Sequence, residues 1–144
     1  MDLNELQEGS IIYIPIFLKG GLVWTGDSHC RQGNGEVNLT ALECSFREIA
    51  LQLIVRKDMK LEWPRAETKT HWILMGFDED LNKAMVSAVR ETVDFLASQK
   101  MVPLDRYEAY SITSMAADCR VTQVVDVRKG VHCMVPKSIF TKKK

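Results

Sequence analysis

The chain has 144 residues, of which 46% are hydrophobic and 26% charged, and 19 basic residues balance 19 acidic ones. This length and composition are typical of one globular domain, which we expect to span residues 1–144. A formal net charge of zero lacks the cationic footprint that nucleic-acid binding requires, so we expect no nucleic-acid partner.

No segment indicates a membrane span or an export signal. The longest uncharged apolar run, residues 11–18, is too short to cross a bilayer. The chain opens with Asp2 and Glu5, whereas the first part of a secretory signal is basic. We therefore expect no membrane partner, a cytoplasmic location and reduced thiols, and we treat the 14-residue spacing within two cysteine pairs as coincidence. The cysteines are Cys30, Cys44, Cys119 and Cys133. The lysines at 142–144 are expected to form a solvated end.

The first half of the chain is expected to be rich in strands. Residues 11–17 are β-branched and aromatic, and Pro15 restricts this strand to an edge or a bulge. Residues 37–57 also favour strands, most clearly at 49–55, where the alternation is typical of a strand with one buried face. A further strand is predicted at 71–76.

Two helices are expected to follow. Apolar residues recur at the three-four spacing of one helical face over residues 79–99, and Asp78 is placed to cap the N-terminus of this helix. A second helix is predicted to start near Pro103, a favourable first-turn residue, and to run to about Ala117.

The end of the chain returns to strands. Residues 121–125 and 131–135 are β-branched runs separated by a short polar turn, which predicts a C-terminal β-hairpin. The fold class is therefore α+β: a strand-rich N-terminal half with a glycine-rich polar loop, two helices and the C-terminal hairpin.

The glycine-rich loop, residues 25–36, is the segment in which chemistry is most concentrated. Asp27 and His29 are two residues apart, so in an extended stretch their side chains project to the same face. Mixed carboxylate and imidazole ligands suit zinc or a similar divalent metal, which lowers the pKa of bound water. Glu36 could then accept the proton of that water. The alternative is a polar loop of turn-forming residues without a function. A typical catalytic zinc site needs three protein ligands, so a further ligand is expected elsewhere.

Other polar residues are weaker candidates. Asp118 and Gln123 frame the junction between the second helix and the hairpin, where Asp118 either caps a helix or lines a pocket. His71 and His132 lie in predicted strands and are expected to be structural. Glu43 lies among apolar neighbours and is expected to face solvent, because burial of an unpaired carboxylate is costly.

A nucleophilic Cys30 is a separate hypothesis. Its neighbours His29 and Arg31 could both stabilise a thiolate. Adjacent residues of an extended chain point in opposite directions, however, so a Cys30–His29 pair is geometrically poor.

Several motifs occur together and in order along most of the chain. They lie at residues 8–16, 26–37, 62–65, 109–126 and 135–140. The most specific is Gly-Asp-x-His-x-x-Gln-Gly-x-Gly-Glu, which spans residues 26–36. With these motifs the sequence resembles the acetamidase/formamidase family of amide hydrolases. At Asn34 this family more often has aspartate, and at Cys30 it more often has alanine or phenylalanine.

The resemblance implies hydrolysis of short linear amides, such as formamide or acetamide, to a carboxylic acid and ammonia. It also implies a divalent metal, zinc being the expected one, and an oligomeric enzyme. We assign Asp27 and His29 as metal ligands. As catalytic residues we assign Glu36, in an acid/base role, and Asp118. The residues expected to contact the small amide substrate are Gln32, Gly33, Gly35 and Gln123.

Members of this family are longer, and the chain resembles their C-terminal half. The N-terminal half is expected to carry further histidine and aspartate residues of the site. One hypothesis is therefore a metal-dependent amidase that forms a homo-oligomer. A second is a catalytically incomplete fragment or partner subunit, which serves as an interaction domain and associates with a separate N-terminal half. A third is an unrelated small metal-binding domain.

Overall fold

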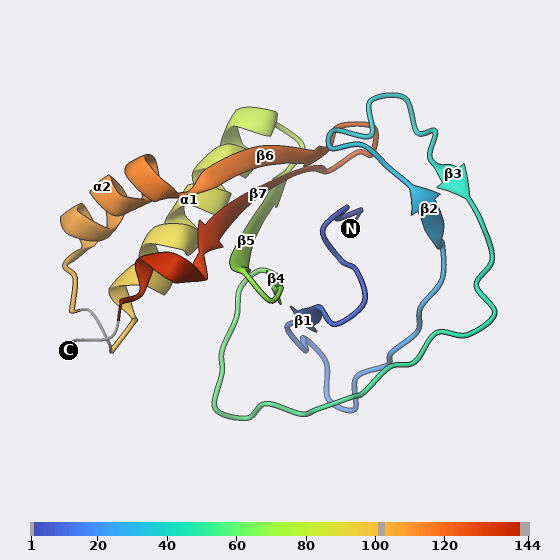
Figure 1. Ribbon diagram of the computed structural model, residues 1–144, viewed down its shortest axis with the longest axis horizontal. Helices are drawn as coiled ribbons and strands as arrows, with labels where there is room; N and C mark the ends of the chain where they lie inside the picture. The colour runs from blue at the N-terminus through green and yellow to red at the C-terminus, as the bar shows by residue number, and fades with distance from the viewer. Residues whose placement is uncertain (1, 101–102, 142–144) are drawn as a thin grey trace.

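The computed structural model of the chain describes residues 2–100 and 103–141, so the lysines at 142–144 lie outside the described residues. A five-stranded antiparallel sheet, in the order β1-β4-β5-β7-β6, carries both helices on one face, and β2 and β3 form a separate two-stranded sheet (Figure 1). The fold class is α+β, as the sequence predicts. The elements are β1 (Ile11–Tyr13), β2 (His29–Arg31), β3 (Leu42–Glu43), β4 (Arg65–Glu67), β5 (His71–Asp78), α1 (Leu81–Ala97), α2 (Arg106–Ala116), β6 (Asp118–Gln123) and β7 (Lys129–Pro136), followed by a 3-10 turn, Lys137–Ile139.

Helix α1 packs very closely on the sheet. A Cβ added at Gly76 of β5 would collide with the backbone of Ala88, so only glycine permits this approach. Leu74 of β5 and Leu96 of α1 belong to one buried cluster, which α2 extends through Ala109. Neither helix in the described part of the chain has the length and apolar character of a membrane span.

The helix caps differ from the predicted ones. Asp80, not Asp78, caps α1, because its carboxylate accepts the backbone N–H groups of Asn82 and Lys83. Asp78 instead accepts the N–H of Asp80 and shapes the turn before the helix. Helix α2 starts later than expected, because Asp105 forms a reciprocal capping box with Glu108.

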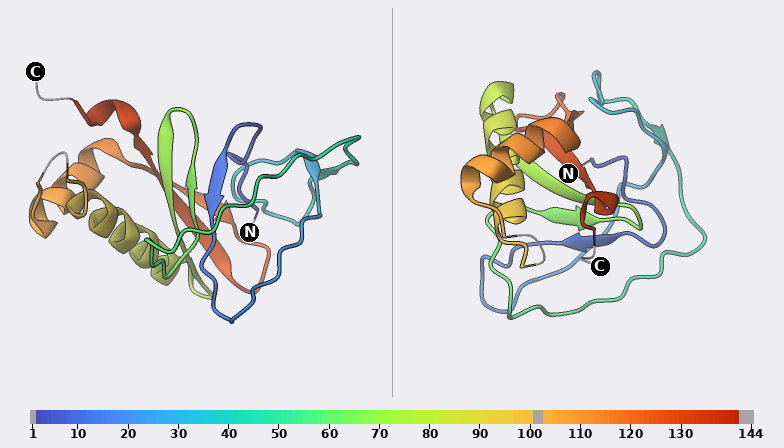
Figure 2. Two further views of the ribbon diagram at one scale, coloured as in Figure 1. Left: turned by 90° about the horizontal axis from the view of Figure 1, so that it is seen from below. Right: turned by 60° about the vertical axis from the view of Figure 1, so that its left-hand side comes forward.

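The N-terminal segment covers the other face of the sheet. Leu3 is buried against Ile73, Met75 and Met134, and the segment lies on the side of the sheet away from the helices (Figure 2). Strand β1 ends at Tyr13, before Pro15, and it lies at the edge of the sheet as predicted.

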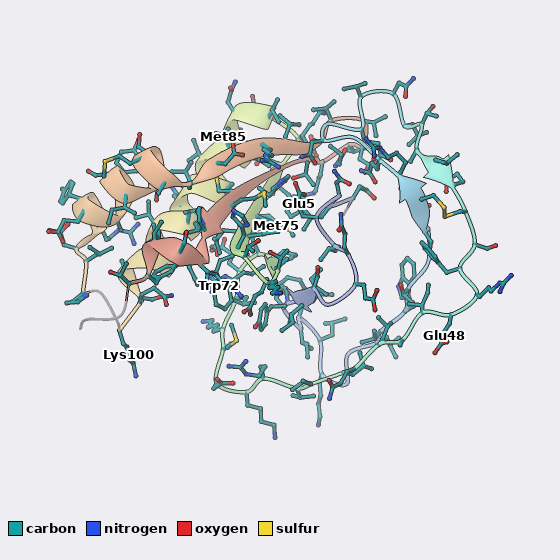
Figure 3. The ribbon with its side chains drawn as sticks, viewed as in Figure 1. Glu5, Glu48, Trp72, Met75, Met85 and Lys100 are labelled. Atoms are coloured by element: carbon teal, nitrogen blue, oxygen red, sulfur yellow. A yellow bond between two sulfur atoms is a disulfide. The ribbon has the colours of Figure 1, made fainter. Side chains whose placement is uncertain are left out.

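The prediction of long strands between β1 and β4 is wrong. Of residues 37–57, only β3 is a strand, and residues 49–55 form an extended segment without ladder partners. Large apolar side chains of this segment and of residues 14–24 are exposed, with Leu22 98% and Trp24 86% accessible. In Figure 3, Glu48 marks how far this part of the chain lies from the sheet. Strand pairing needs a neighbouring strand, and the described residues supply none here.

The prediction of reduced thiols is also wrong. Cys30 is bonded to Cys44, with 5.8 Å between their Cα atoms, and Cys119 is bonded to Cys133, with 4.0 Å. Cys119 and Cys133 lie opposite each other in the antiparallel β6–β7 ladder, whereas Cys30 and Cys44 are joined beside the irregular β2–β3 pairing and are not register partners.

Candidate metal centre and active site

The glycine-rich loop contains a short strand that positions its polar groups. Strand β2 pairs with β3 in antiparallel register, which places His29 directly opposite Glu43. Side chains at opposed positions of an antiparallel pair lie close enough to interact. The ladder is irregular between His29 and Arg31, so the pairing is short.

Three side chains converge at this pairing. Nε2 of His29 lies 3.1 Å from Oδ1 of Asp27 and 3.2 Å from Oε1 of Glu43. The three donor atoms lie within 4.8 Å of one another, as the ligands of one ion do. The side chain of His29 is 12% exposed, whereas those of Asp27 and Glu43 are 70% and 66% exposed. We call these three residues the carboxylate–histidine cluster.

Gln32 fixes the orientation of the imidazole. Its amide Nε2 donates to the carbonyl of Asp2, so its Oε1 is left to accept from Nδ1 of His29, 3.0 Å away. Nδ1 therefore carries a proton, and Nε2 faces the two carboxylates. An imidazole that ligates a metal commonly donates its other N–H to an acceptor in this way.

The electrostatics of the cluster favour a cation. The hydrogen bond that His29 donates to Gln32 raises the pKa of His29; partial burial opposes this, and the hydrogen bond to Asp27 and the charges of Glu43 and Asp27 raise it further. Two carboxylates facing one Nε2 need either a proton or a metal ion between them. Two oxygens and one nitrogen suit zinc or a similar divalent metal, so the residues present fit such an ion.

The backbone of the loop is strained at two of the predicted site residues. Asp27 and Glu36 have φ values of 57° and 35°, in the left-handed region that side chains other than glycine seldom adopt. Such strain persists only where the surroundings enforce it, and it concentrates at functional sites. Gly35, at φ 98°, is held against β6 by hydrogen bonds to the backbone of Thr122 and Val124.

Glu36 is the buried carboxylate of the loop, with 8% of its surface exposed. Burial raises its pKa above the ordinary value, and the charge of Asp2 raises it further, while His29 opposes the change. A carboxyl group with a raised pKa holds a proton more readily than a free carboxyl group, which suits an acid/base role. The charges of His29 and Asp27 act on Glu36, so it lies within electrostatic range of the cluster.

A hydrogen-bonded network holds the loop against the hairpin. Glu5 accepts from Asn34 and from Arg120, each at 3.2 Å, and its second oxygen lies 3.3 Å from Nε2 of the fully buried His132. Nδ1 of His132 lies 2.8 Å from the hydroxyl of Thr122. In Figure 3, Glu5 lies on the N-terminal segment, beside the β6–β7 hairpin.

The remaining predicted residues are not all brought to the cluster. The side-chain amide of Gln123 donates a hydrogen bond to the carbonyl of Arg128 and accepts one from the N–H of Asp126. These two bonds stabilise the hairpin turn. Asp118 lies at the opposite end of β6 and pairs with Arg120. The carbonyl of Gly33 accepts from the N–H of Glu36, and a Cβ added at Gly33 would meet no atom within 4 Å.

Glu43 is the residue that sequence reasoning did not assign to the site. It faces solvent, as expected, and nevertheless reaches His29. The sequence pattern carries no signal for this contact, because it depends on the antiparallel register of β2 and β3.

The cluster lies on an open surface. A hollow in the described surface lies elsewhere, between residues 7–11 and 67–70, and contains none of the three cluster residues. Both carboxylates of the cluster are largely exposed in the described part of the chain.

Comparisons with known proteins agree on one family. The model of the "Acetamidase/Formamidase family" matches residues 1–142. An acetamidase from Bacillus halodurans is similar in structure, with a TM-score of 0.85 and 29% identity over 96% of this chain and 46% of that one. An acetamidase from Yersinia enterocolitica has a TM-score of 0.84 and 26% identity, covering 99% and 42%. A predicted acetamidase/formamidase from Thermoanaerobacter tengcongensis has a TM-score of 0.84 and 28% identity, covering 96% and 45%. Among curated proteins none matches. The chain spans less than half the length of these solved structures.

Proposed function

The chain belongs to the acetamidase/formamidase family, and from that membership we propose that it forms the metal-binding part of an amide hydrolase. The substrates are short linear amides such as formamide or acetamide, and the products are a carboxylate and ammonia. Family membership supports amide hydrolysis as the general reaction. The metal and the site residues are proposals from the geometry of this chain.

The observation that carries this proposal is the convergence of Asp27, His29 and Glu43 on one point. Three protein ligands with open positions are the usual arrangement of a catalytic zinc site. Gln32 is not a ligand itself, but its hydrogen bond holds the imidazole of His29 in one tautomer.

A divalent ion bound by these residues would polarise the amide carbonyl and lower the pKa of a bound water. The chain's own groups perform the proton transfers. Glu36 accepts a proton from the attacking water and delivers it to the amide nitrogen, so that the carbon–nitrogen bond breaks and ammonia leaves. The raised pKa of Glu36 suits it to hold this proton between the two steps. Gly33, where an added Cβ would meet no atom within 4 Å, leaves room for substrate beside the loop, and Gly35 remains a predicted substrate-contacting residue. Asp118 and Gln123 remain predicted site residues and have no step in this mechanism.

A second candidate function is that of a subunit that needs another polypeptide. It is favoured by the exposed apolar side chains of residues 14–24 and 49–55, because contiguous apolar surface of this kind marks interaction sites. The partner would be a chain equivalent to the part of the acetamidases that has no counterpart here. It would cover this apolar surface and enclose the carboxylate–histidine cluster. Association with copies of this chain and a cytoplasmic location stay predictions.

The first test is ammonia release from formamide and acetamide by the purified chain supplied with zinc. Glu43→Ala and His29→Ala should each abolish it. Glu48→Ala, which changes an exposed glutamate outside the cluster, should leave it intact. Equal activity in Glu43→Ala and Glu48→Ala would contradict the assigned ligand set. Inactivity of the unaltered chain, followed by activity after a polypeptide equivalent to the absent part is added, would favour the subunit function.

A further inference from the structure

The Cys30–Cys44 disulfide adjoins the carboxylate–histidine cluster. Cys30 directly follows His29 in β2, and Cys44 directly follows Glu43 at the end of β3. The bond therefore links the two backbone segments that present these ligands. The N–H of Cys44 also donates to the carbonyl of Ser28 at 3.2 Å, next to the same pair.

Little else in the described residues holds these two strands together. β2 has three residues, β3 has two, and their register is interrupted. The side chains of Leu42 and Glu43 are largely exposed, so β3 has no apolar core beneath it. A two-stranded ribbon without a packed face is only marginally stable in water. The disulfide thus supplies the constraint that packing does not.

The second disulfide lies in a different environment and provides a contrast. Cys119–Cys133 joins β6 to β7 inside the five-stranded sheet, and Cys133 is fully buried in a cluster with Ala84 and Ala88 of α1. Ladder hydrogen bonds and helix packing hold this strand pair in addition to the disulfide. Cys30, in contrast, is exposed, so a reductant can reach it.

We propose that the Cys30–Cys44 disulfide positions Glu43 against His29, and that its reduction by a dithiol releases Glu43 and weakens divalent-metal binding. In this exchange the dithiol gives two electrons and two protons and becomes a disulfide, while the sulfur–sulfur bond breaks into two cysteine thiols. The inference deepens the proposed function and rests on its metal site. Cys30 and Cys44 are positioning residues, because they act through the ligands beside them.

The linkage itself is checked first. Trypsin digestion without reductant should leave peptide 20–31 bonded to peptide 32–47, and peptide 107–120 bonded to peptide 130–137. Recovery of peptides 20–31 and 32–47 as separate thiols would overturn the inference.

Zinc affinity is then measured by competition with a chromophoric chelator on three chains. They are the unaltered oxidised chain, the Cys30→Ala/Cys44→Ala variant and the matched Cys119→Ala/Cys133→Ala variant. Replacement by alanine removes the link without creating thiols that would bind zinc themselves. We expect affinity at least tenfold lower in the first variant and within twofold of the unaltered chain in the second.

Hydrogen exchange of the metal-free chains separates positioning from general destabilisation. In the Cys30→Ala/Cys44→Ala variant, amides of residues 27–44 should exchange faster, while those of β5 and β7 stay protected. Reduction of the unaltered chain, followed by removal of the dithiol, should weaken zinc binding, and reoxidation should restore it.

The other outcomes overturn the inference in distinguishable ways. Equal zinc affinity in the unaltered chain and the Cys30→Ala/Cys44→Ala variant refutes positioning and leaves the proposed metal site intact. Equal losses in both variants show an effect through overall stability. No zinc uptake by any of the three chains refutes the metal site, and the inference with it.

Discussion

Glu5 should stabilise the fold in a strongly pH-dependent way. Burial alone would raise the pKa of this carboxyl group, but the hydrogen bond and charge of His132, with a further hydrogen bond from Asn34, lower it from 4.5 to about 2. A carboxylate whose folded pKa is depressed stabilises the protein above its unfolded pKa. That contribution is lost as the pH falls from 4.5 through about 2.

The size of this effect follows from the two pKa values. Each pKa unit corresponds to about 1.4 kcal/mol, so the full contribution of Glu5 near neutral pH is about 3 kcal/mol. Between pH 5 and pH 3, which are accessible to experiment, about 2 kcal/mol of it should disappear. Glu5→Gln removes the titrating group. At pH 7 the free energy of unfolding of this variant should therefore be lower than that of the unaltered chain, and between pH 5 and pH 3 it should not show this loss.

Urea unfolding followed by tryptophan fluorescence, with both disulfides oxidised and a chelator present, measures the difference at pH 7, 5 and 3. Glu8→Gln is the control, because Glu8 lies on the same segment and is exposed. The two stability curves of the unaltered chain and Glu5→Gln should converge as the pH falls. Parallel curves would refute the assignment of this acid dependence to Glu5.

Three further predictions follow from local contacts. Gly76→Ala should lower the free energy of unfolding by about 3 kcal/mol, because the added Cβ collides with the backbone of Ala88, and chemical unfolding measures this loss. Gln32→Leu should weaken zinc binding by about 10- to 100-fold in chelator competition, because His29 loses the acceptor that sets its tautomer, and an unchanged affinity would contradict that role. Asp80→Ala should cost about 1 kcal/mol in thermal or urea unfolding through loss of the α1 cap, whereas a cap at Asp78 would make this change silent.

Sequence patterns predict the helical half of the fold well. Helix α1 and strand β5 pack on each other, so their apolar periodicities report real buried faces. The C-terminal hairpin has its partner strand close by in the sequence, and its turn is short. The alternation at residues 49–55 is equally regular, but no described strand pairs with this segment, and it does not form a strand. Periodicity reports the preference of a segment and does not report whether a partner is present.

The candidate site could be predicted from the sequence only in part, for a similar reason. Asp27 and His29 are local neighbours, and their two-residue spacing suffices to predict their approach. Glu43 reaches the same point through strand pairing, which depends on register and on a disulfide that composition did not indicate. Gln123 has a suitable side chain for substrate binding, but backbone groups of its own turn occupy it.

The network around Glu5 also sets an order for assembly. Glu5 binds Arg120, which lies 115 residues later in the chain, and Gly35 binds the backbone at Thr122 and Val124. During synthesis the glycine-rich loop is therefore complete long before either of its anchors exists. The loop takes its final shape only when the β6–β7 hairpin has left the ribosome, so these two strands decide when the candidate ligands Asp27 and His29 reach their final positions.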